Sequence, residues 1–195
     1  MITLVDSPVA NVANIARALR ASGAELDLTR DPSSIANAIK IVLPGVGSFA
    51  AAMQWLVETR IDIALREAVA NGAYLLGICV GHQLLFDSSD EMGVTRGLGM
   101  IRGDVRKFEG ALPVPQIGWN RVRARGPLFD GVESEAFYFV NSYAARDVES
   151  EIASADYNGS FTAAVQRERV LGVQFHPEKS STAGLRVLRN FVACN

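Results

Sequence analysis

Cysteine and histidine are scarce in this sequence, which contains two of each among its 195 residues. Two cysteines are too few for the disulfide framework of a small secreted domain, so we expect a reducing, cytoplasmic setting. No group of histidines and cysteines has the spacing of a metal site, and we expect neither a metal nor an organic cofactor. The chemistry of the chain therefore depends on where these few side chains lie.

Long apolar runs and blocks of like charge are also missing. No apolar stretch approaches the length of a membrane-spanning helix, and Met1–Asp6 lacks the basic start of a signal peptide. The net charge is only -2 and is spread along the chain, which argues against nucleic acid and membrane surfaces as partners. Because no repeat or linker interrupts it, the chain is expected to form a single domain over residues 1–195.

Strands and helices alternate in the first half of the sequence. Expected strands are Ile2–Val5, Glu25–Leu28, Lys40–Leu43 and Tyr74–Ile78, and expected helices are Asn11–Ala21, a segment starting at Asp31-Pro32, Phe49–Val57 and Ile61–Ala70. This alternation predicts an α/β fold with a mainly parallel central sheet flanked by helices.

The second half changes character, since short strand-like segments are separated by glycine, proline and charged turns. These segments are Val105–Phe108, Arg121–Ala124, Ala136–Val140, Thr162–Arg167 and Val170–Phe175, with a hairpin turn at Glu168-Arg169 and a closing helix over Ala183–Ala193. The C-terminal half is therefore expected to be richer in strands and more antiparallel.

One cysteine lies in the motif Gly77-Ile78-Cys79-Val80-Gly81-His82-Gln83, between the apolar runs that end at Leu76 and begin at Leu84. This pattern predicts a strand, a sharp turn and a helix, with glycines two residues on either side of Cys79, as in a nucleophile elbow. A helix N-terminus favours the reactive thiolate. The alternative is a small buried cysteine in a tight turn.

A candidate base lies almost one hundred residues downstream. His176 ends an apolar strand, and Glu178 follows two residues later, within reach of its imidazole. A cysteine nucleophile needs such a base, and the base needs an orienting partner. Taken alone, these two residues also fit a surface histidine beside a solvated glutamate.

A third segment, Leu43-Pro44-Gly45-Val46-Gly47-Ser48, follows another predicted strand. Its two glycines allow free peptide orientation, so an N–H group could face an oxyanion formed at Cys79. An ordinary strand-to-helix loop is the alternative. In parallel sheets, sites form at the carboxyl ends of strands, so we expect this segment and Cys79 to lie close together.

Taken together, the three segments resemble the class I (triad) glutamine amidotransferases. The resemblance implies that Cys79 is the nucleophile, His176 the base and Glu178 its orienting carboxylate. It places the oxyanion hole at Val80 and the Gly45-Val46-Gly47 peptides. The residues implied to hold the substrate L-glutamine are Gln83, Ser142 and Tyr143.

Further stretches resemble the glutaminase subunits of imidazole glycerol phosphate synthases over essentially the whole chain. They are Leu84–Glu91, Gly97–Ile101, Ile117–Asn120, Tyr138–Tyr143 and His176–Ser180. The resemblance implies a heterodimer in which ammonia passes through a tunnel to a (β/α)₈ cyclase subunit. It also implies partner contacts at Trp119 and Asn120, and at Asn11 and Asn14. The alternatives are half-buried packing for the tryptophan and polar positions at a helix start for Asn11 and Asn14.

The sequence departs from that subfamily outside the three motifs. The departures are the segment Ser7–Ala10, His82 in place of methionine, and Gln116 and Asn141 in place of histidines. They leave glutamine hydrolysis intact and bear on the acceptor and the partner. The alternatives are a paralogue that supplies ammonia for sugar amidation in surface polysaccharide synthesis, a stand-alone cysteine hydrolase or redox-sensing thiol protein, and an inactive binding subunit.

Overall fold

A mixed eight-stranded sheet forms the centre of the computed structural model, which describes residues 1–8 and 11–194. Its strand order is β2-β1-β3-β4-β14-β13-β12-β9. The bounds are β1 (Ile2–Val5), β2 (Leu26–Thr29), β3 (Lys40–Gly45), β4 (Tyr74–Cys79), β9 (Arg123–Ala124), β12 (Glu151–Asp156), β13 (Ser160–Arg167) and β14 (Val170–Val173). The pairs from β2 to β14 are parallel and those beyond are antiparallel, which confirms the predicted change of character.

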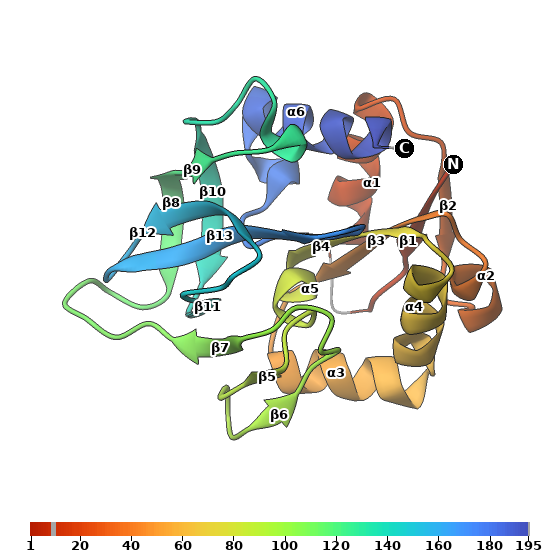
Figure 1. The fold of residues 1–195 in the computed structure, drawn as a ribbon, viewed down its shortest axis with the longest axis horizontal. Helices are drawn as coiled ribbons and strands as arrows, with labels where there is room; N and C mark the ends of the chain where they lie inside the picture. Colours follow the sequence, from red (N-terminus) through yellow and green to blue (C-terminus); the bar gives the residue numbers. More distant parts are fainter. Residues whose placement is uncertain (9–10, 195) are drawn as a thin grey trace.

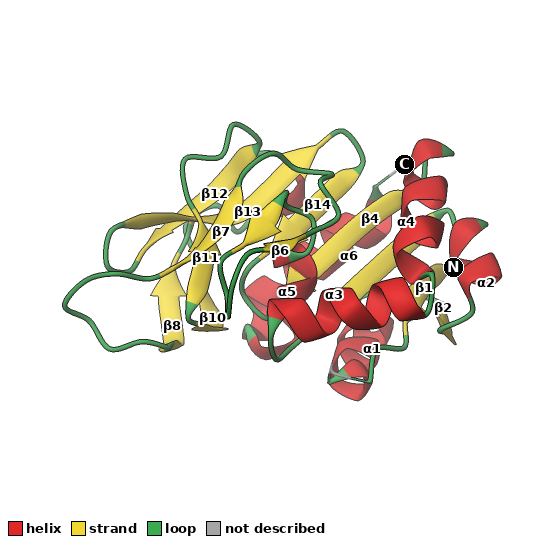
Figure 2. Cartoon of the chain, turned by 90° about the horizontal axis from the view of Figure 1, so that it is seen from below, coloured by secondary structure: helices red, strands yellow, loops and turns green. Residues whose placement is uncertain are grey.

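Helices cover both faces of the parallel part of the sheet (Figures 1 and 2). On one face lie α1 (Val12–Ala21) and α6 (Ser181–Ala193); on the other lie α3 (Phe49–Glu58) and α4 (Ile61–Ala70). The remaining helices are α2 (Pro32–Ala36), α5 (Val80–Gln83) and the 3₁₀ turns η1 (Pro127–Phe129) and η2 (Pro177–Lys179). The long helices bury residues at helical spacing, as Ile15, Ala18 and Leu19 do on α1.

Two smaller sheets lie beside the main sheet (Figures 1 and 2). One is the ribbon of β8 (Gln116–Arg121) and β10 (Ala136–Asn141); the other contains β5 (Ser88–Ser89), β6 (Thr95–Arg96), β7 (Asp104–Lys107) and β11 (Tyr143–Ala145). On β10, Phe137 and Phe139 are fully buried and pack against Phe175, with ring centroids 4.2 and 5.8 Å away. This aromatic cluster ties the ribbon to the main sheet just before His176.

The helix after Cys79 is shorter than the apolar run predicts. It ends at Gln83, although Leu84, Leu85 and Phe86 were expected to continue it. The carbonyls of these three residues instead accept hydrogen bonds from the backbone N–H groups of residues 98–101, for example Leu98 to Leu84 at 2.7 Å. Because those carbonyls are taken by a distant segment, the helix stops.

The prediction around Trp119 was wrong in its secondary structure. No strand was expected over Ile117–Asn120 and one was expected over Arg121–Ala124, yet β8 covers Gln116–Arg121 and β9 only Arg123–Ala124. Glycine and proline near Trp119 hide the strand signal, while pairing with β10 from distant sequence supplies the ladder. Strand β12 was not predicted either, because its sequence does not clearly alternate apolar and polar residues.

No helix of the described residues is long and apolar enough to cross a membrane. Of the predicted departure at Ser7–Ala10, Val9 and Ala10 lie outside the described residues, whereas Ser7 is buried beside the end of β1.

Candidate active site

Cys79 occupies a sharp elbow between β4 and α5. Its backbone has φ 57° and ψ -113°, a conformation rarely adopted by a residue with a side chain. The surrounding glycines permit it, because a Cβ on Gly81 would lie 2.0 Å from the Leu43 carbonyl oxygen and one on Gly77 would lie 2.5 Å from the Gly81 oxygen. The chain backbones therefore touch, as the sequence motif predicts.

The Gly45–Gly47 segment lies directly beside this elbow. Gly45 pairs with Cys79 at the end of the β3–β4 ladder, and a Cβ on Gly45 would lie 2.7 Å from the Gly81 nitrogen. Val46 and Gly47 are exposed and line the same pocket as Cys79 and Val80. The expected closeness of the segment and the cysteine is confirmed.

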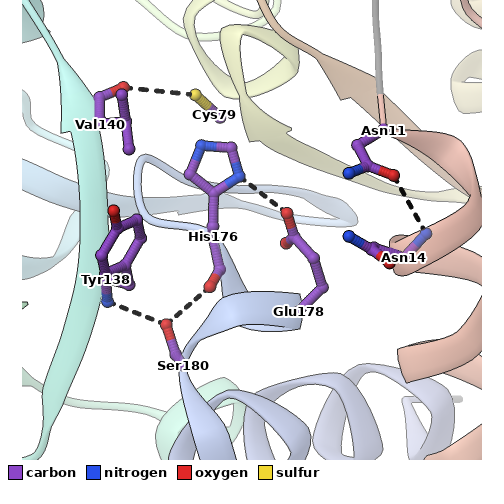
Figure 3. A network of polar contacts seen from close by, with 8 residues as sticks. All are labelled: Asn11, Asn14, Cys79, Tyr138, Val140, His176, Glu178 and Ser180. Atoms are coloured by element: carbon purple, nitrogen blue, oxygen red, sulfur yellow. Dashed lines mark hydrogen bonds and ion pairs between the residues drawn. The ribbon is translucent and has the colours of Figure 1, made fainter. Parts of the chain in front are cut away.

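His176 and Glu178 form a buried pair opposite the elbow (Figure 3). His176 Nδ1 lies 2.8 Å from Glu178 Oε1, with side-chain exposures of 6% and 1%. The backbone around them is fixed, since the Ser180 hydroxyl donates to the His176 carbonyl at 2.6 Å and accepts from the Tyr138 N–H at 2.9 Å. In Figure 3 the imidazole lies between Cys79 and Glu178.

The pKa of His176 reflects this environment. Burial lowers it, but hydrogen bonds and charge interactions with Cys79 and Glu178 outweigh burial and raise the pKa from 6.5 to about 10. The imidazole is therefore protonated at neutral pH. Since the folded pKa lies above the unfolded value, its contribution to stability is complete below pH 6.5 and is lost as the pH rises through about 10.

A pocket of about 330 Å³ opens in front of Cys79. It brings together the predicted residues Val46, Gly47, Val80, Gln83, Ser142, Tyr143 and His176. It is also lined by Glu91, Pro115, Val140, Asn141 and Lys179, which no motif had assigned to the substrate. Glu91 lies within a stretch used for the family resemblance, so only its individual role escaped prediction. Among the described residues, no three His, Cys, Asp or Glu side chains are grouped to hold a metal ion.

Gln83 is held by neighbours that fix which end of its amide faces the pocket. Its Nε2 donates to the Tyr143 carbonyl at 3.0 Å and to Gln174 Oε1 at 2.9 Å. Both amide protons are thus used, which leaves Oε1 as the group available to a ligand. Asn141 Nδ2 donates to the same Tyr143 carbonyl at 3.0 Å.

Glu91 joins the pocket to the helix that follows the Gly45–Gly47 segment. Its Oε2 accepts a hydrogen bond from the backbone N–H of Phe49, the first residue of α3, at 2.6 Å. Burial raises the pKa of Tyr143, and the charges of Glu91 and Asp90 add to this shift. The Glu91 carboxylate is a negative group at this end of the pocket. It therefore suits a positively charged group of a ligand.

The residues that depart from the subfamily pattern are buried around this site. Gln116 and Asn141 face each other across the β8–β10 ladder, and each leaves its carbonyl oxygen without a partner among the described residues. His82, on α5, is fully buried against Gly172, where a Cβ would lie 2.4 Å from His82 Nδ1. Its ring meets Phe86 edge-on, and neither nitrogen has a hydrogen-bond partner among the described residues.

We predict that His82 makes the protein sensitive to acid. Burial lowers the pKa of His82 to about 3, so below pH 6.5 the unfolded chain takes up a proton that the folded chain refuses. His82→Met should therefore gain stability relative to the wild type as the pH falls, by about 2 kcal/mol between pH 7 and pH 5. The urea unfolding midpoints of the wild type and His82→Met at the two pH values measure this difference. Equal changes of the midpoint in both proteins between pH 7 and pH 5 would contradict the prediction.

The residues predicted to meet a partner take different positions. Trp119 is 56% exposed on the outer face of β8, packed edge-on against Tyr138 at 6.1 Å between ring centroids. Asn120 points the other way, and its Nδ2 donates to the Asp156 carbonyl at 2.9 Å. Asn11 caps α1 by accepting from the Asn14 N–H at 3.4 Å (Figure 3).

Comparison with known proteins places this geometry in a family. The sequence profile described as "Glutamine amidotransferase class-I" matches residues 3–194. The chain belongs to the class-I glutamine amidotransferases. Among curated relatives of this amidotransferase, proteins from Herpetosiphon aurantiacus and Geobacillus thermodenitrificans are each 43% identical over 98% of the chain and 93% and 95% of their own lengths. Both are named "Imidazole glycerol phosphate synthase subunit HisH".

Solved structures support the same fold for this amidotransferase. A structure titled "Crystal structure of glutamine amidotransferase" superposes with a TM-score of 0.79 at 20% identity, covering 98% of this chain and 97% of that one. The structure of PurLQS from Thermotoga maritima gives a TM-score of 0.71 at 19% identity, with coverage of 98% and 96%. The predicted amidotransferase-like α/β fold is thereby confirmed.

Proposed function

We propose that this chain is the glutaminase subunit of an imidazole glycerol phosphate synthase, which hydrolyses glutamine to glutamate and ammonia for histidine biosynthesis. One observation carries the proposal: a strained cysteine and a buried His–Glu pair face each other across a single pocket. The curated relatives, similar over nearly the full chain, supply the name of the assembly. We further propose that residues 1–195 form one domain and work in the cytoplasm, where a thiol stays reduced.

The reaction follows from the geometry. Cys79 Sγ attacks the carboxamide carbon of glutamine, and His176 gives its proton to the departing ammonia. The negative oxygen of the intermediate is stabilised by the Val80 N–H at the start of α5 and by a peptide N–H of the Gly45–Gly47 segment. Water then hydrolyses the thioester with His176 as base, and Glu178 holds the imidazole throughout.

Substrate recognition uses the groups that the pocket leaves available. Gln83 presents an acceptor oxygen, and Glu91 presents a carboxylate, so both suit the α-ammonium or amide N–H groups of glutamine. Ser142 and Tyr143 lie at the same wall. No step requires a metal or an organic cofactor, because thiol, imidazole and backbone N–H groups supply the whole chemistry.

The partner surface is the outer face of the β8–β10 ribbon, next to the pocket. Ile117 and Trp119 are 64% and 56% exposed, and they pair across the ladder with Val140 and Tyr138. Adjacent exposed apolar side chains of this kind mark interaction sites. We propose that a (β/α)₈ cyclase subunit docks here as a heterodimer and receives the ammonia, with Asn11, Asn14 and Asn120 near the edge of the contact.

The alternative functions are weaker. Supply of ammonia for sugar amidation uses the same active site and differs only in the partner, but the curated relatives reported above carry the synthase name. A stand-alone hydrolase does not require the exposed ribbon, and an inactive binding subunit does not require an intact triad.

The proposed function is tested with the chain and the cyclase subunit of the same organism. Glutamine should support formation of imidazole glycerol phosphate from the nucleotide substrate of the cyclase. His176→Ala should abolish this activity, whereas Glu178→Gln should retain measurable turnover, because an orienting residue contributes less than the base. If the chain forms no product with the cyclase but transfers ammonia to a sugar-modifying partner, the alternative function replaces this one. Wild-type rates in both variants would refute the triad.

A further inference from the structure

The segment that supplies the oxyanion N–H is fixed at both ends and open between them. At one end Gly45 has no lateral room, because a Cβ would lie 2.7 Å from the Gly81 nitrogen. At the other end the Phe49 N–H is held by Glu91 at 2.6 Å. Between them Gly47 has φ +85° and open space around its Cα, so the peptides of residues 46–48 have freedom that their flanks lack.

Glu91 comes to this helix start from a distant part of the chain. It lies in the turn between β5 and β6, where its own N–H donates to the Ser89 hydroxyl at 3.2 Å. Strand β6 packs against α3, so the turn is brought to the first residue of the helix (Figure 1). Ser48 already caps α3 through its hydroxyl on the Ala51 N–H at 3.3 Å, and Glu91 therefore holds a second N–H of the same turn.

The same carboxylate also lines the glutamine pocket with Gly47 and Cys79. Only Oε2 is used by Phe49, and Oε1 has no hydrogen-bond partner among residues 1–8 and 11–194. A bound amino acid brings a positive ammonium group into this negative end of the pocket, where Oε1 can accept from it. One side chain thus contacts both the substrate region and the anchor of the oxyanion segment.

Resting on the proposed glutaminase function, we propose that Glu91 is a positioning residue that couples glutamine occupancy to the orientation of the oxyanion segment. When the α-ammonium binds Oε1, the carboxylate is held in the position from which Oε2 fixes the Phe49 N–H. The end of the segment is then fixed while the carboxamide lies at Cys79. An amide substrate without the α-ammonium leaves the carboxylate, and therefore the segment, less constrained.

The test measures glutamate or glutarate release by the complex with the cyclase subunit and its nucleotide ligand. The two substrates are glutamine and glutaramate, which is glutamine without its α-amino group. Glu91→Gln keeps an oxygen for the Phe49 N–H and loses the charge, so KM for glutamine should rise about tenfold with kcat within about threefold. Glu91→Ala loses both contacts, so kcat for glutamine should also fall about tenfold. The wild-type enzyme should show this same reduced kcat with glutaramate, which cannot bind Oε1 through an ammonium group.

Asp31→Ala is the matched control, because Asp31 Oδ2 caps the remote helix α2 through the Ser34 N–H at 2.9 Å. It should lower the melting temperature and leave both kinetic constants unchanged. A wild-type kcat for glutamine in Glu91→Ala would overturn the coupling and reduce Glu91 to a binding residue. Equal losses with glutamine and glutaramate would make its role merely structural, and no release by the wild-type complex would instead refute the proposed function.

Discussion

Replacing Cys79 by serine or alanine is expected to abolish glutamine-dependent synthesis, while ammonia-dependent synthesis by the partner survives. The loss should reach about 10⁴-fold or more, because a nucleophile and its base act as a unit. Serine keeps the size of the side chain at the strained elbow, so its failure would reflect chemistry and not packing. Product formation is measured with glutamine and, separately, with ammonium salt at alkaline pH.

Labelling with a chloroketone analogue of glutamine provides the independent readout. The label should map to Cys79, which faces the pocket, and should disappear in Cys79→Ser. Cys194 is the internal control, since it lies at the end of α6 with its Sγ 3.4 Å from the Asn190 carbonyl oxygen. Burial raises the pKa of Cys194, which disfavours its reactive thiolate. Label found on Cys194 with full activity in Cys79→Ser would overturn the assignment.

The parts of this site that the sequence predicts are those encoded by local backbone requirements. The elbow at Cys79 needs glycine at 77 and 81, because backbone atoms there leave no room for a Cβ. His176 and Glu178 are separated by one proline, so their contact is fixed within a single turn. Strand-to-helix alternation then brings Gly45 and Cys79 to the same edge of the parallel sheet.

The parts that escaped prediction depend on contacts between distant segments. Glu91 reaches the pocket only because β6 packs on α3, and nothing in its neighbouring residues signals that contact. The strand containing Trp119 exists through its pairing with β10, which a local pattern with glycine and proline conceals. The length of α5 is likewise set by hydrogen bonds from residues 98–101 and not by the apolar residues that follow it.

Two residues that depart from the subfamily pattern, Gln116 and Asn141, lie next to each other in the fold. Gln116 and Asn141 lie 25 positions apart in sequence but are direct partners in the β8–β10 register. Both are neutral amides, both are buried, and Asn141 lines the pocket. Because neither side chain ionises, this pair adds no charge next to the pocket at any pH.

Glutamate release by the isolated chain is expected to be low, and to rise about a hundred- to a thousand-fold when the cyclase partner and its nucleotide ligand are both bound. This range corresponds to one oxyanion donor, because a missing N–H at a developing negative charge costs about 3 kcal/mol. The proposed donor at Val80 is fixed by the start of α5, so we expect the variable donor in the Gly45–Gly47 segment.

The local backbone can provide this change. Gly47 has φ +85°, and a Cβ at this residue would meet no atom within 4 Å, so the adjoining peptide has room to turn its carbonyl or its N–H towards Cys79. A ligand shifts such an equilibrium only by its differential affinity for the two states, which the partner supplies when its acceptor is bound. Ammonia is then released only when it can be used. Rates should be compared for the chain alone, with the partner, and with partner plus nucleotide; a rate already maximal in the isolated chain would exclude the switch and favour a stand-alone hydrolase.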